Sequence, residues 1–371
     1  MSDIHDQDSK PVDTGAADPP REHVGRGPDG QRVRRRKSLD SEDELVLHEA
    51  EPNAAARGDQ ALNPDVPAKE MGKSEGPGKL AWRRQRRRRL PLILFVVTCL
   101  STFWVGANHW LPWPVDGELR RMLLAHWQDG LTYMGCVLAI LFAHEMGHFL
   151  ATVRYGIPAS FPYFIPFPIS PIGTMGAVIG MDGLKADRKE LFDIGLAGPL
   201  SGLVVALPVM WIGVTKLDFQ QFEYGPFALD LPLLIRAAVY VIQPSGHTSE
   251  TAVWFSHLNP YFMAGWVGLL VTGLNMMPVS QLDGGHVVYT LFGRKAHWIA
   301  RTFVVAAILV VVVSGRWEWS PMILIVLLIG PDHPPTRNDH MPLGCVRTVL
   351  GISAILIPVF CFPLRLIILP M

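Results

Sequence analysis

Apolar runs of membrane-span length dominate the sequence from Leu90 onward, and they limit the possible folds more than any other feature. About 20 apolar residues in a helix cross the roughly 30 Å hydrocarbon core of a bilayer. Because backbone polar groups must be paired inside that core, we expect an all-α polytopic membrane protein with about six to seven transmembrane helices. The run 319–330 is short and fits either a tilted short helix or half of a broken one. The candidate spans are residues 91–110, 131–152, 191–214, 261–280, 298–314, 319–330 and 348–369.

Residues 1–80 differ in composition from the rest of the chain. They are rich in Asp, Glu, Arg, Gly and Pro and nearly free of aromatic residues, so they bury too little apolar surface to fold alone. We predict a disordered, charged N-terminal tail here and a membrane-embedded domain at 81–371, with its core at 131–290 and C-terminal helices at 298–369. The formal net charge is zero, so no basic excess indicates a nucleic-acid partner.

The distribution of charged residues predicts how the chain is oriented in the membrane. The cluster RRQRRRR at 83–89 directly precedes the first apolar run, and basic residues beside a span stay on the cytoplasmic side. We therefore expect a cytoplasmic N-terminus. Alternating spans then place residues 153–190 on the cytoplasmic side and residues 215–260, where acidic residues outnumber basic ones, on the outer side.

The segment 157–184 is strongly apolar but contains five prolines, which exclude a regular helix. Its second half, from Gly173 to Gly183, is typical of extended chain, with glycines where another backbone can approach closely. Non-helical backbone at membrane depth needs shielding by protein or by a water-filled cavity. We predict a small membrane-associated β-element, a re-entrant or interfacial hairpin beside the second span. A Pro-rich connector on the surface is an equally open alternative.

Three ionisable residues interrupt the apolar run LAILFAHEMGHFLATVRYG at 138–156. His144, Glu145 and His148 fit the pattern H-E-x-x-H, in which two histidines four residues apart share one helix face and can bind a single zinc ion. Glu145 would sit beside the open coordination position. Ionisable residues within spans are costly and normally mark functional sites, so zinc binding is favoured over a structural polar cluster.

A catalytic zinc site takes three protein ligands and keeps one position for water, so a third donor must come from elsewhere. Asp283 in QLDGGH is the candidate, because the predicted orientation places it at a depth similar to that of the two histidines. A turn at a helix C-terminus is the other interpretation of Asp283-Gly284-Gly285, and both can hold at once. His286 is a rival ligand by residue type, or a residue that supports the ligands.

Two further polar features lie in apolar surroundings. Asn275 lies about two helical turns before Asp283. Its structural interpretation is that its amide forms a hydrogen bond with a neighbouring helix. Its functional interpretation is an amide that holds the substrate backbone or the developing oxyanion. We expect Asp193 and the run GLAGPLSG at 195–202 to serve close helix packing.

Taken together, these motifs resemble a known family, the site-2 proteases, which are intramembrane zinc metalloproteases of peptidase family M50. The resemblance rests on HEMGH, FPYFIPFPISPIGTMGAVIG, GLAGPLSG and NMMPVSQLDGGH, which follow in the family's order over roughly residues 130–290. It implies one Zn²⁺ per chain, with His144, His148 and Asp283 as ligands and Glu145 as the general base. It also implies substrate contacts by Asn275 and by the extended segment near 173–183. The candidates within that segment are Gly173, Thr174 and Gly176.

The activity that the resemblance implies is the hydrolysis of peptide bonds within or near transmembrane segments of membrane proteins, as in regulated intramembrane proteolysis. The expected partners are membrane-protein substrates and the lipid bilayer, without nucleic acid. The expected location is the plasma (inner) membrane of a bacterium, with the site towards the cytoplasm. Two other classes stay open: a zinc-binding transporter or sensor without hydrolytic activity, and a catalytically dead scaffold that binds membrane proteins.

Overall fold

The protein is described from a computed structural model, which covers residues 24–26, 32–34, 77–111, 119–181, 183–246, 251–279 and 282–369. The chain divides into two compact units, Met1–Lys73 and Ser74–Met371. Among the described residues of the first unit, β1 (Val24–Arg26) pairs antiparallel with β2 (Arg32–Arg34). The predicted disordered tail at residues 1–80 lies almost entirely outside the described residues and stays a prediction.

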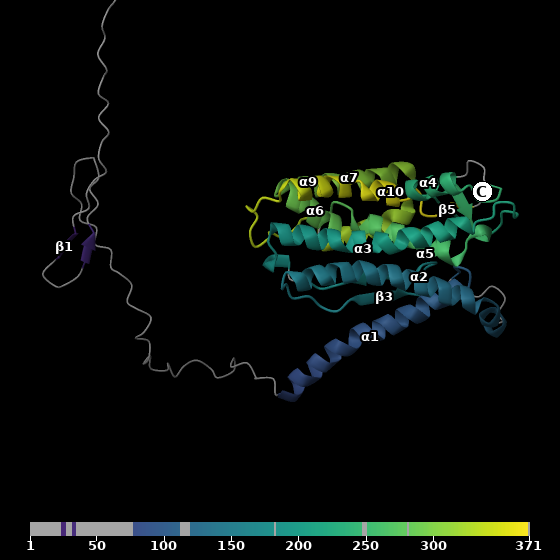
Figure 1. Cartoon of the computed structure of the whole chain (residues 1–371), viewed down its shortest axis with the longest axis horizontal. Helices are drawn as coiled ribbons and strands as arrows, with labels where there is room; N and C mark the ends of the chain where they lie inside the picture. Colours follow the sequence, from purple (N-terminus) through teal and green to yellow (C-terminus); the bar gives the residue numbers. More distant parts are fainter. Residues whose placement is uncertain are drawn as a thin grey trace, which may run out of the picture. The chain divides into compact units, whose positions relative to one another are not determined.

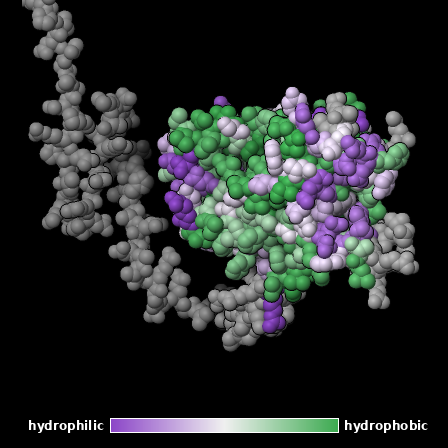
Figure 2. Space-filling view, turned by 45° about the vertical axis from the view of Figure 1, so that its right-hand side comes forward, coloured by the Kyte–Doolittle hydropathy of each residue, from purple (hydrophilic) through white to green (hydrophobic). Residues whose placement is uncertain are grey.

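The second unit is mostly helical, and among its described residues four helices are long and apolar enough to cross a membrane. Figure 2 shows hydrophobic residues spread over much of the visible face, with hydrophilic residues gathered towards its two ends. The chain is therefore a membrane protein, as predicted, whereas the number of six to seven spans stays a prediction. The four helices are α1 (Pro77–Ala107), α2 (Leu119–Arg154), α3 (Arg188–Thr215) and α7 (Lys295–Ser314).

The helices of this unit pack in successive layers. α1 crosses α2 obliquely, α2 packs on α3, and α3 packs in turn on α6 (Asp283–Phe292), as Figure 1 shows. The start of α3 is fixed by a capping box, in which the side chain of Asp187 accepts from the backbone of Glu190 and the side chain of Glu190 accepts from the backbone of Asp187. α3 thus begins at a defined residue beside the carboxyl end of α2.

The centre of the unit is α5 (Pro260–Asn275), which contacts α2, α3 and α10 (Ile357–Cys361). Its 16 residues span about 24 Å, less than a bilayer core, and 11 of them are buried. We predicted a helix over 261–280, but the helix ends at Asn275. Pro278 lacks the N–H that a continuing helix needs, and the chain turns there towards α6.

The other described elements are short. The short elements are η1 (Gly183–Lys185), β5 (Ala228–Asp230), α4 (Leu233–Ile242), β6 (Ala252–Trp254), η2 (Phe255–His257), η3 (Trp317–Trp319), α8 (Ser320–Ile329) and α9 (Cys345–Ala354). Of these, the helix α4 and the antiparallel pair β5 and β6 lie in the predicted outer segment 215–260, where the sequence did not indicate them.

The C-terminal apolar run differs from the single span predicted at 348–369. It forms two consecutive short helices, α9 and α10, and its helical part ends at Cys361. Phe362 has extended backbone angles (φ −97°, ψ 126°), as expected for a residue that precedes a proline. Pro363 therefore ends the helix well before residue 369.

The predicted β-hairpin is confirmed. β3 (Tyr163–Phe167) pairs antiparallel with β4 (Gly173–Val178), with a bulge between Phe164 and Pro166. Proline supplies no N–H to a ladder, which is why Pro166 lies at this irregularity. The hairpin contacts α1 and α2 (Figure 1). Within the described residues β3 is the only strand that pairs with β4, so the second edge of β4 carries no strand.

Asp193 does not serve close helix packing as we expected. Its carboxylate accepts two hydrogen bonds of 2.8 Å from the guanidinium of Arg347 on α9, and another from the hydroxyl of Tyr155 just beyond α2. One carboxylate thus connects three segments that are far apart in sequence. An Arg side chain 154 residues away is not visible in the local pattern around Asp193.

Candidate metal centre

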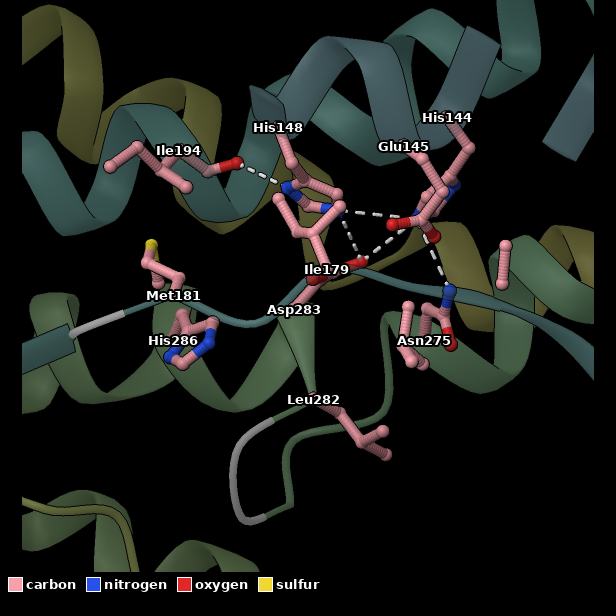
Figure 3. A pocket seen from close by; sticks show the side chains of 12 residues that line it. His144, Glu145, His148, Ile179, Met181, Ile194, Asn275, Leu282, Asp283 and His286 are labelled. Atoms are coloured by element: carbon pink, nitrogen blue, oxygen red, sulfur yellow. Dashed lines mark hydrogen bonds and ion pairs between the residues drawn. The ribbon is translucent and has the colours of Figure 1, made fainter. Parts of the chain in front are cut away.

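Two histidines on α2 and the first residue of α6 meet in the interior of the unit (Figure 3). The Nε2 atom of His144 lies 3.1 Å from Oδ2 of Asp283, and Nε2 of His148 lies 3.2 Å from the same oxygen. The two Nε2 atoms are 3.2 Å apart. His144 and His148 are 3% and 6% exposed, so water cannot solvate this cluster freely. The sequence-predicted ligands therefore come together.

The distances within this cluster match those around a metal ion. Zinc bonds of about 2.0–2.1 Å in a tetrahedral site place neighbouring ligand atoms about 3.3 Å apart, close to the three distances observed. Nε2 of His144 has a further neighbour, Nδ2 of Asn275, at 3.2 Å. One imidazole nitrogen carries a single proton or a single lone pair, so hydrogen bonds alone cannot satisfy all of these neighbours. The two imidazoles and the carboxylate thus fit a bound zinc ion.

A backbone carbonyl sets the orientation of His148. Its Nδ1 donates a hydrogen bond of 2.8 Å to the carbonyl of Ile194 on α3. Because a carbonyl only accepts, the proton of a neutral imidazole is on Nδ1, and the lone pair on Nε2 points towards Asp283. This is the tautomer that a metal ligand needs. Sequence reasoning did not find Ile194, because any residue supplies a carbonyl.

The segment Asp283-Gly284-Gly285 forms a helix start and not the helix C-terminal turn that we considered. Asp283 is the first residue of α6, with Leu282 before it as the N-cap. A Cβ atom on Gly284 would lie 2.1 Å from the carbonyl oxygen of Met276, just beyond α5. The close turn between α5 and α6 therefore requires glycine at this position, and that turn carries Asp283 towards α2.

Glu145 faces the same space as the ligands. It is 4% exposed, and Figure 3 shows its carboxylate beside the imidazoles of His144 and His148. These residues line a cavity of about 150 Å³, large enough for several water molecules. Glu145 does not belong to the cluster of possible metal ligands that His144, His148 and Asp283 form. The arrangement thus combines a metal-binding cluster, a carboxylate that could exchange protons, and space for water and substrate.

Asn275 and His286 also line this cavity, in different ways. The amide of Asn275, at the end of α5, lies 3.2 Å from Nε2 of His144 and faces the ligand cluster. His286 Nδ1 instead lies 2.6 Å from Nε2 of His333, and no hydrogen bond joins His286 to a ligand within the described residues. Burial and the nearby His333 lower the pKa of His286 to about 3. His333 lies within a Pro-rich loop, and no sequence signal connected it with the site.

The predicted segment 173–183 supplies one wall of the cavity, through residues other than its three named candidates. Ala177 and Val178 of β4, and Ile179 after it, line the cavity. Gly173, Thr174 and Gly176 lie on β4 and are absent from its lining. The hydroxyl of Thr174 donates to the carbonyl of Ile165, which holds the hairpin together.

The glycines of GLAGPLSG serve close helix packing, as predicted, with Gly198 and Gly202 against α2 and Gly195 against α6. A Cβ atom on Gly198 would lie 2.0 Å from Nε2 of His148, and one on Gly202 would lie 3.1 Å from Nδ1 of His144. In the opposite direction, a Cβ atom on Gly147 of α2 would lie 2.4 Å from the carbonyl of Ala197. α2 and α3 therefore approach closely at the level of the two histidines. The closeness of this contact to the imidazoles was not visible in the sequence.

Comparison with known proteins identifies the family. Residues 132–314 match the model of Peptidase family M50, and this region contains all three candidate ligands and Glu145. This part of the chain belongs to peptidase family M50. The resemblance to the site-2 proteases, which make up this family, is thereby confirmed.

Several plant proteins are similar to this chain. The chain is 33% identical over 239 residues to the "Probable zinc metalloprotease EGY1, chloroplastic" of Arabidopsis thaliana, covering 61% of this chain and 42% of that protein. It is 28% identical over 275 residues to the EGY1 of Oryza sativa subsp. japonica, covering 72% of this chain and 45% of that protein. It is 28% identical over 221 residues to EGY2 of Arabidopsis thaliana, covering 58% of this chain and 38% of that protein. The chain thus spans less than half the length of these relatives.

Proposed function

We propose that this protein is an intramembrane zinc metalloprotease that hydrolyses peptide bonds within or near transmembrane segments of membrane proteins. The observation that carries the proposal is the contact of one Asp283 oxygen with the Nε2 atoms of both His144 and His148, beside Glu145 in a buried cavity. Membership of family M50 supports it, as do relatives whose names describe zinc metalloproteases. Membrane-protein substrates and a lipid environment follow from the same assignment.

One Zn²⁺ per chain would be held by His144, His148 and Asp283. When bound, zinc lowers the pKa of water towards 7 and polarises a carbonyl group, which is the chemistry that peptide hydrolysis needs. His148 would hold the ion through Nε2, because its Nδ1 is engaged by the carbonyl of Ile194. The three side chains supply two neutral imidazoles and one carboxylate, a donor set typical of catalytic zinc sites.

Glu145 is the proton carrier in this proposal. Its carboxylate takes a proton from the attacking water and returns it to the leaving amine. Its position beside the ligands and its burial support this role (Figure 3). Asn275 is the proposed hydrogen-bond donor to the carbonyl oxygen of the substrate as negative charge develops there. Its amide faces the ligand cluster from the end of α5.

The unpaired edge of β4 is the proposed substrate-binding element. A helical substrate must unwind before its peptide bond is accessible, and pairing with a strand edge stabilises extended chain. Ala177 and Val178 line the cavity, which supports a substrate strand at this edge. A proline introduced into residues 173–183 is expected to abolish cleavage while zinc stays bound. Unchanged cleavage would contradict this role of β4.

The proposed orientation has a cytoplasmic N-terminus, a metal centre towards the cytoplasm and about six to seven spans. It rests on the basic cluster at 83–89 and on the alternation of spans after it. The membrane of a bacterium stays a prediction, because the curated relatives are described as chloroplastic. Cysteine accessibility on either side of the membrane would test the orientation.

The experiment that tests the activity compares wild type with Glu145→Gln in zinc content and in membrane-protein fragments. We expect Glu145→Gln to keep its zinc, to lose about 10²- to 10⁴-fold in turnover, and to accumulate uncleaved membrane-protein stubs. A transporter or sensor that used the same ligands would keep its function in this variant. A scaffold would hold no zinc and would show no cleavage in wild type. Either of those results would overturn the proposal.

A further inference from the structure

We propose a second divalent metal site, of a class that takes Zn²⁺, formed by His109, His126 and Asp129 at the other end of α2. Each residue offers one ligand atom, and these atoms lie within 4.8 Å of one another. The imidazole rings of His109 and His126 meet edge to face with centroids 4.2 Å apart, and Nδ1 of His126 lies 3.6 Å from Oδ2 of Asp129. Three residues from two segments thus point at one place.

The backbone beneath this cluster is held rigidly by a close helix crossing. A Cβ atom on Gly106 of α1 would lie 2.8 Å from Cβ of Tyr133, and one on Gly130 of α2 would lie 2.8 Å from the carbonyl of Phe103. Gly130 directly follows Asp129. α1 and α2 are therefore in direct contact within three residues of His109 and one residue of Asp129. This contact fixes the distance between the two ligand-bearing segments.

The local conformation of both histidines is unusual and presents them on the same side. His109 follows the end of α1 in the left-handed region (φ +48°), where glycine or asparagine is normally favoured. His126 interrupts the helical angles of α2 (φ −122°, ψ 16°) and stands three residues before Asp129 on one helix face. Non-glycine residues in sparsely populated conformations concentrate at functional sites. The backbone of His109 is thus held in an unfavourable conformation at the place where its imidazole meets that of His126.

The donor set selects the class of metal. Two imidazoles and one carboxylate suit zinc and other divalent transition metals, whereas Ca²⁺ and Mg²⁺ take oxygen ligands. Zinc ligands lie about 3.3 Å apart, and no pair in this cluster is more than 4.8 Å apart, so the widest pair needs to close by at most roughly 1.5 Å. The side chains of His126 and Asp129 are 38% and 44% exposed and are free to make this movement. Three protein ligands leave a fourth position for water.

This site is separate from the M50 centre. Asp129 precedes His144 by 15 residues of α2, which is about 22 Å along the helix axis. The two sites therefore share no ligand. A metal bound here would connect the end of α1 to the beginning of the α2 span, and would stabilise that helix crossing without taking part in hydrolysis.

The test uses the full chain in detergent and the metals Zn²⁺ and Co²⁺ alone. After equilibration with Zn²⁺ and removal of the excess, we expect about two zinc ions per chain in wild type and one in His109→Asn/Asp129→Asn. We also expect one in His144→Asn/His148→Asn and none in the combined variant. Asn is chosen for position 109 because it tolerates the left-handed conformation. The matched control is His340→Asn, an exposed histidine outside both clusters, which should keep two.

The decisive comparison is made in the His144→Asn/His148→Asn background, where the M50 centre is disabled. There, Co²⁺ is expected to give the visible absorption of a bound complex and to raise the thermal unfolding temperature. Adding His109→Asn or Asp129→Asn should remove both effects, while elution volume and helical circular dichroism stay those of the parent. The proposal is overturned if Co²⁺ does not bind in this background. It is equally overturned if binding persists in both added variants, or is lost in His340→Asn.

Discussion

Gly198 of α3 touches the imidazole of His148 so closely that a Cβ atom at this position would lie 2.0 Å from Nε2. Nε2 is the atom that faces Asp283 at 3.2 Å. The packing of α3 therefore limits where Nε2 of His148 on α2 can lie. The observed position of this imidazole therefore requires that residue 198 carry no side chain.

We expect Gly198→Ala to displace His148, with loss of most bound zinc and a fall in turnover of about 10²-fold or more, because small displacements at a catalytic centre are costly. The matched control is Gly135→Ala on the same helix as His148, where an added Cβ atom meets nothing within 4 Å. This control should keep its zinc and gain at most about 1 kcal/mol of stability. Metal analysis and a cleavage assay check both variants. Normal zinc content in Gly198→Ala would show that α3 does not constrain the ligand.

Asn275→Ala is expected to keep its zinc and to lose about 10²- to 10³-fold in kcat, the effect of removing one donor to a developing oxyanion. The amide lies beside His144 and is not one of the three ligands. Steady-state kinetics with a membrane-protein substrate distinguish a role of Asn275 in the transition state from a role in substrate binding. An increase in KM at unchanged kcat would mean that Asn275 binds the substrate equally well before and during reaction.

Arg347→Met is expected to lower the free energy of unfolding by about 1 kcal/mol, because it breaks the two hydrogen bonds to Asp193. The side chains of Arg347 and Asp193 are 35% and 26% exposed, so solvent screening keeps the effect small. Thermal unfolding of this variant, of Asp193→Asn and of the double variant gives the coupling between the two residues. A coupling near zero would mean that the pair does not hold α9 to α3.

Stability should also depend on pH through Asp339, which lies in the loop before α9. Burial alone would raise the pKa of Asp339, but hydrogen bonds from Thr336 and Tyr289, with Arg188 nearby, lower it below its ordinary value. Its carboxylate therefore stabilises the folded state above the unfolded pKa of about 3.9, and this contribution is lost as pH falls through the lower folded value.

The measurement is the thermal unfolding temperature at pH 5 and at pH 3. Wild type should lose more stability over this interval than Asp339→Asn, which cannot titrate at this position. The same acid-induced loss in both proteins would assign the pH dependence to other carboxylates.

The clustering of His144 and His148 on one face of α2 was predictable because helical spacing is a local property. His144 and His148 share a face in any helix, and ionisable residues stand out in an apolar run. The contact between Asp283 and these histidines was expected from depth and from family resemblance, since spacing along the chain does not determine which helices pack together. The start of α6 at Asp283 was missed because Asp-Gly-Gly is compatible with both ends of a helix.

Features that depend on three-dimensional contact were less accessible. Pro278 and Pro363 signal chain breaks, but apolar runs on both sides led to spans at 261–280 and 348–369 that were too long. The carbonyl of Ile194 and the contact at Gly198 involve backbone, which carries no residue-type signal. The prolines at 157–184 did predict the hairpin, because they exclude a helix whatever the tertiary structure.

The first span and the strand beside the cavity are physically attached. The hydroxyl of Ser101 on α1 donates a hydrogen bond to the carbonyl of Gly173 at the start of β4. A Cβ atom on Gly173 would lie 3.0 Å from Cα of Thr102. α1 therefore cannot shift sideways in the bilayer without carrying β4 with it. Changes in lipid thickness that alter the tilt of α1 are therefore expected to move β4, whose Ala177 and Val178 line the cavity, although none of the described side chains of α1 lines it.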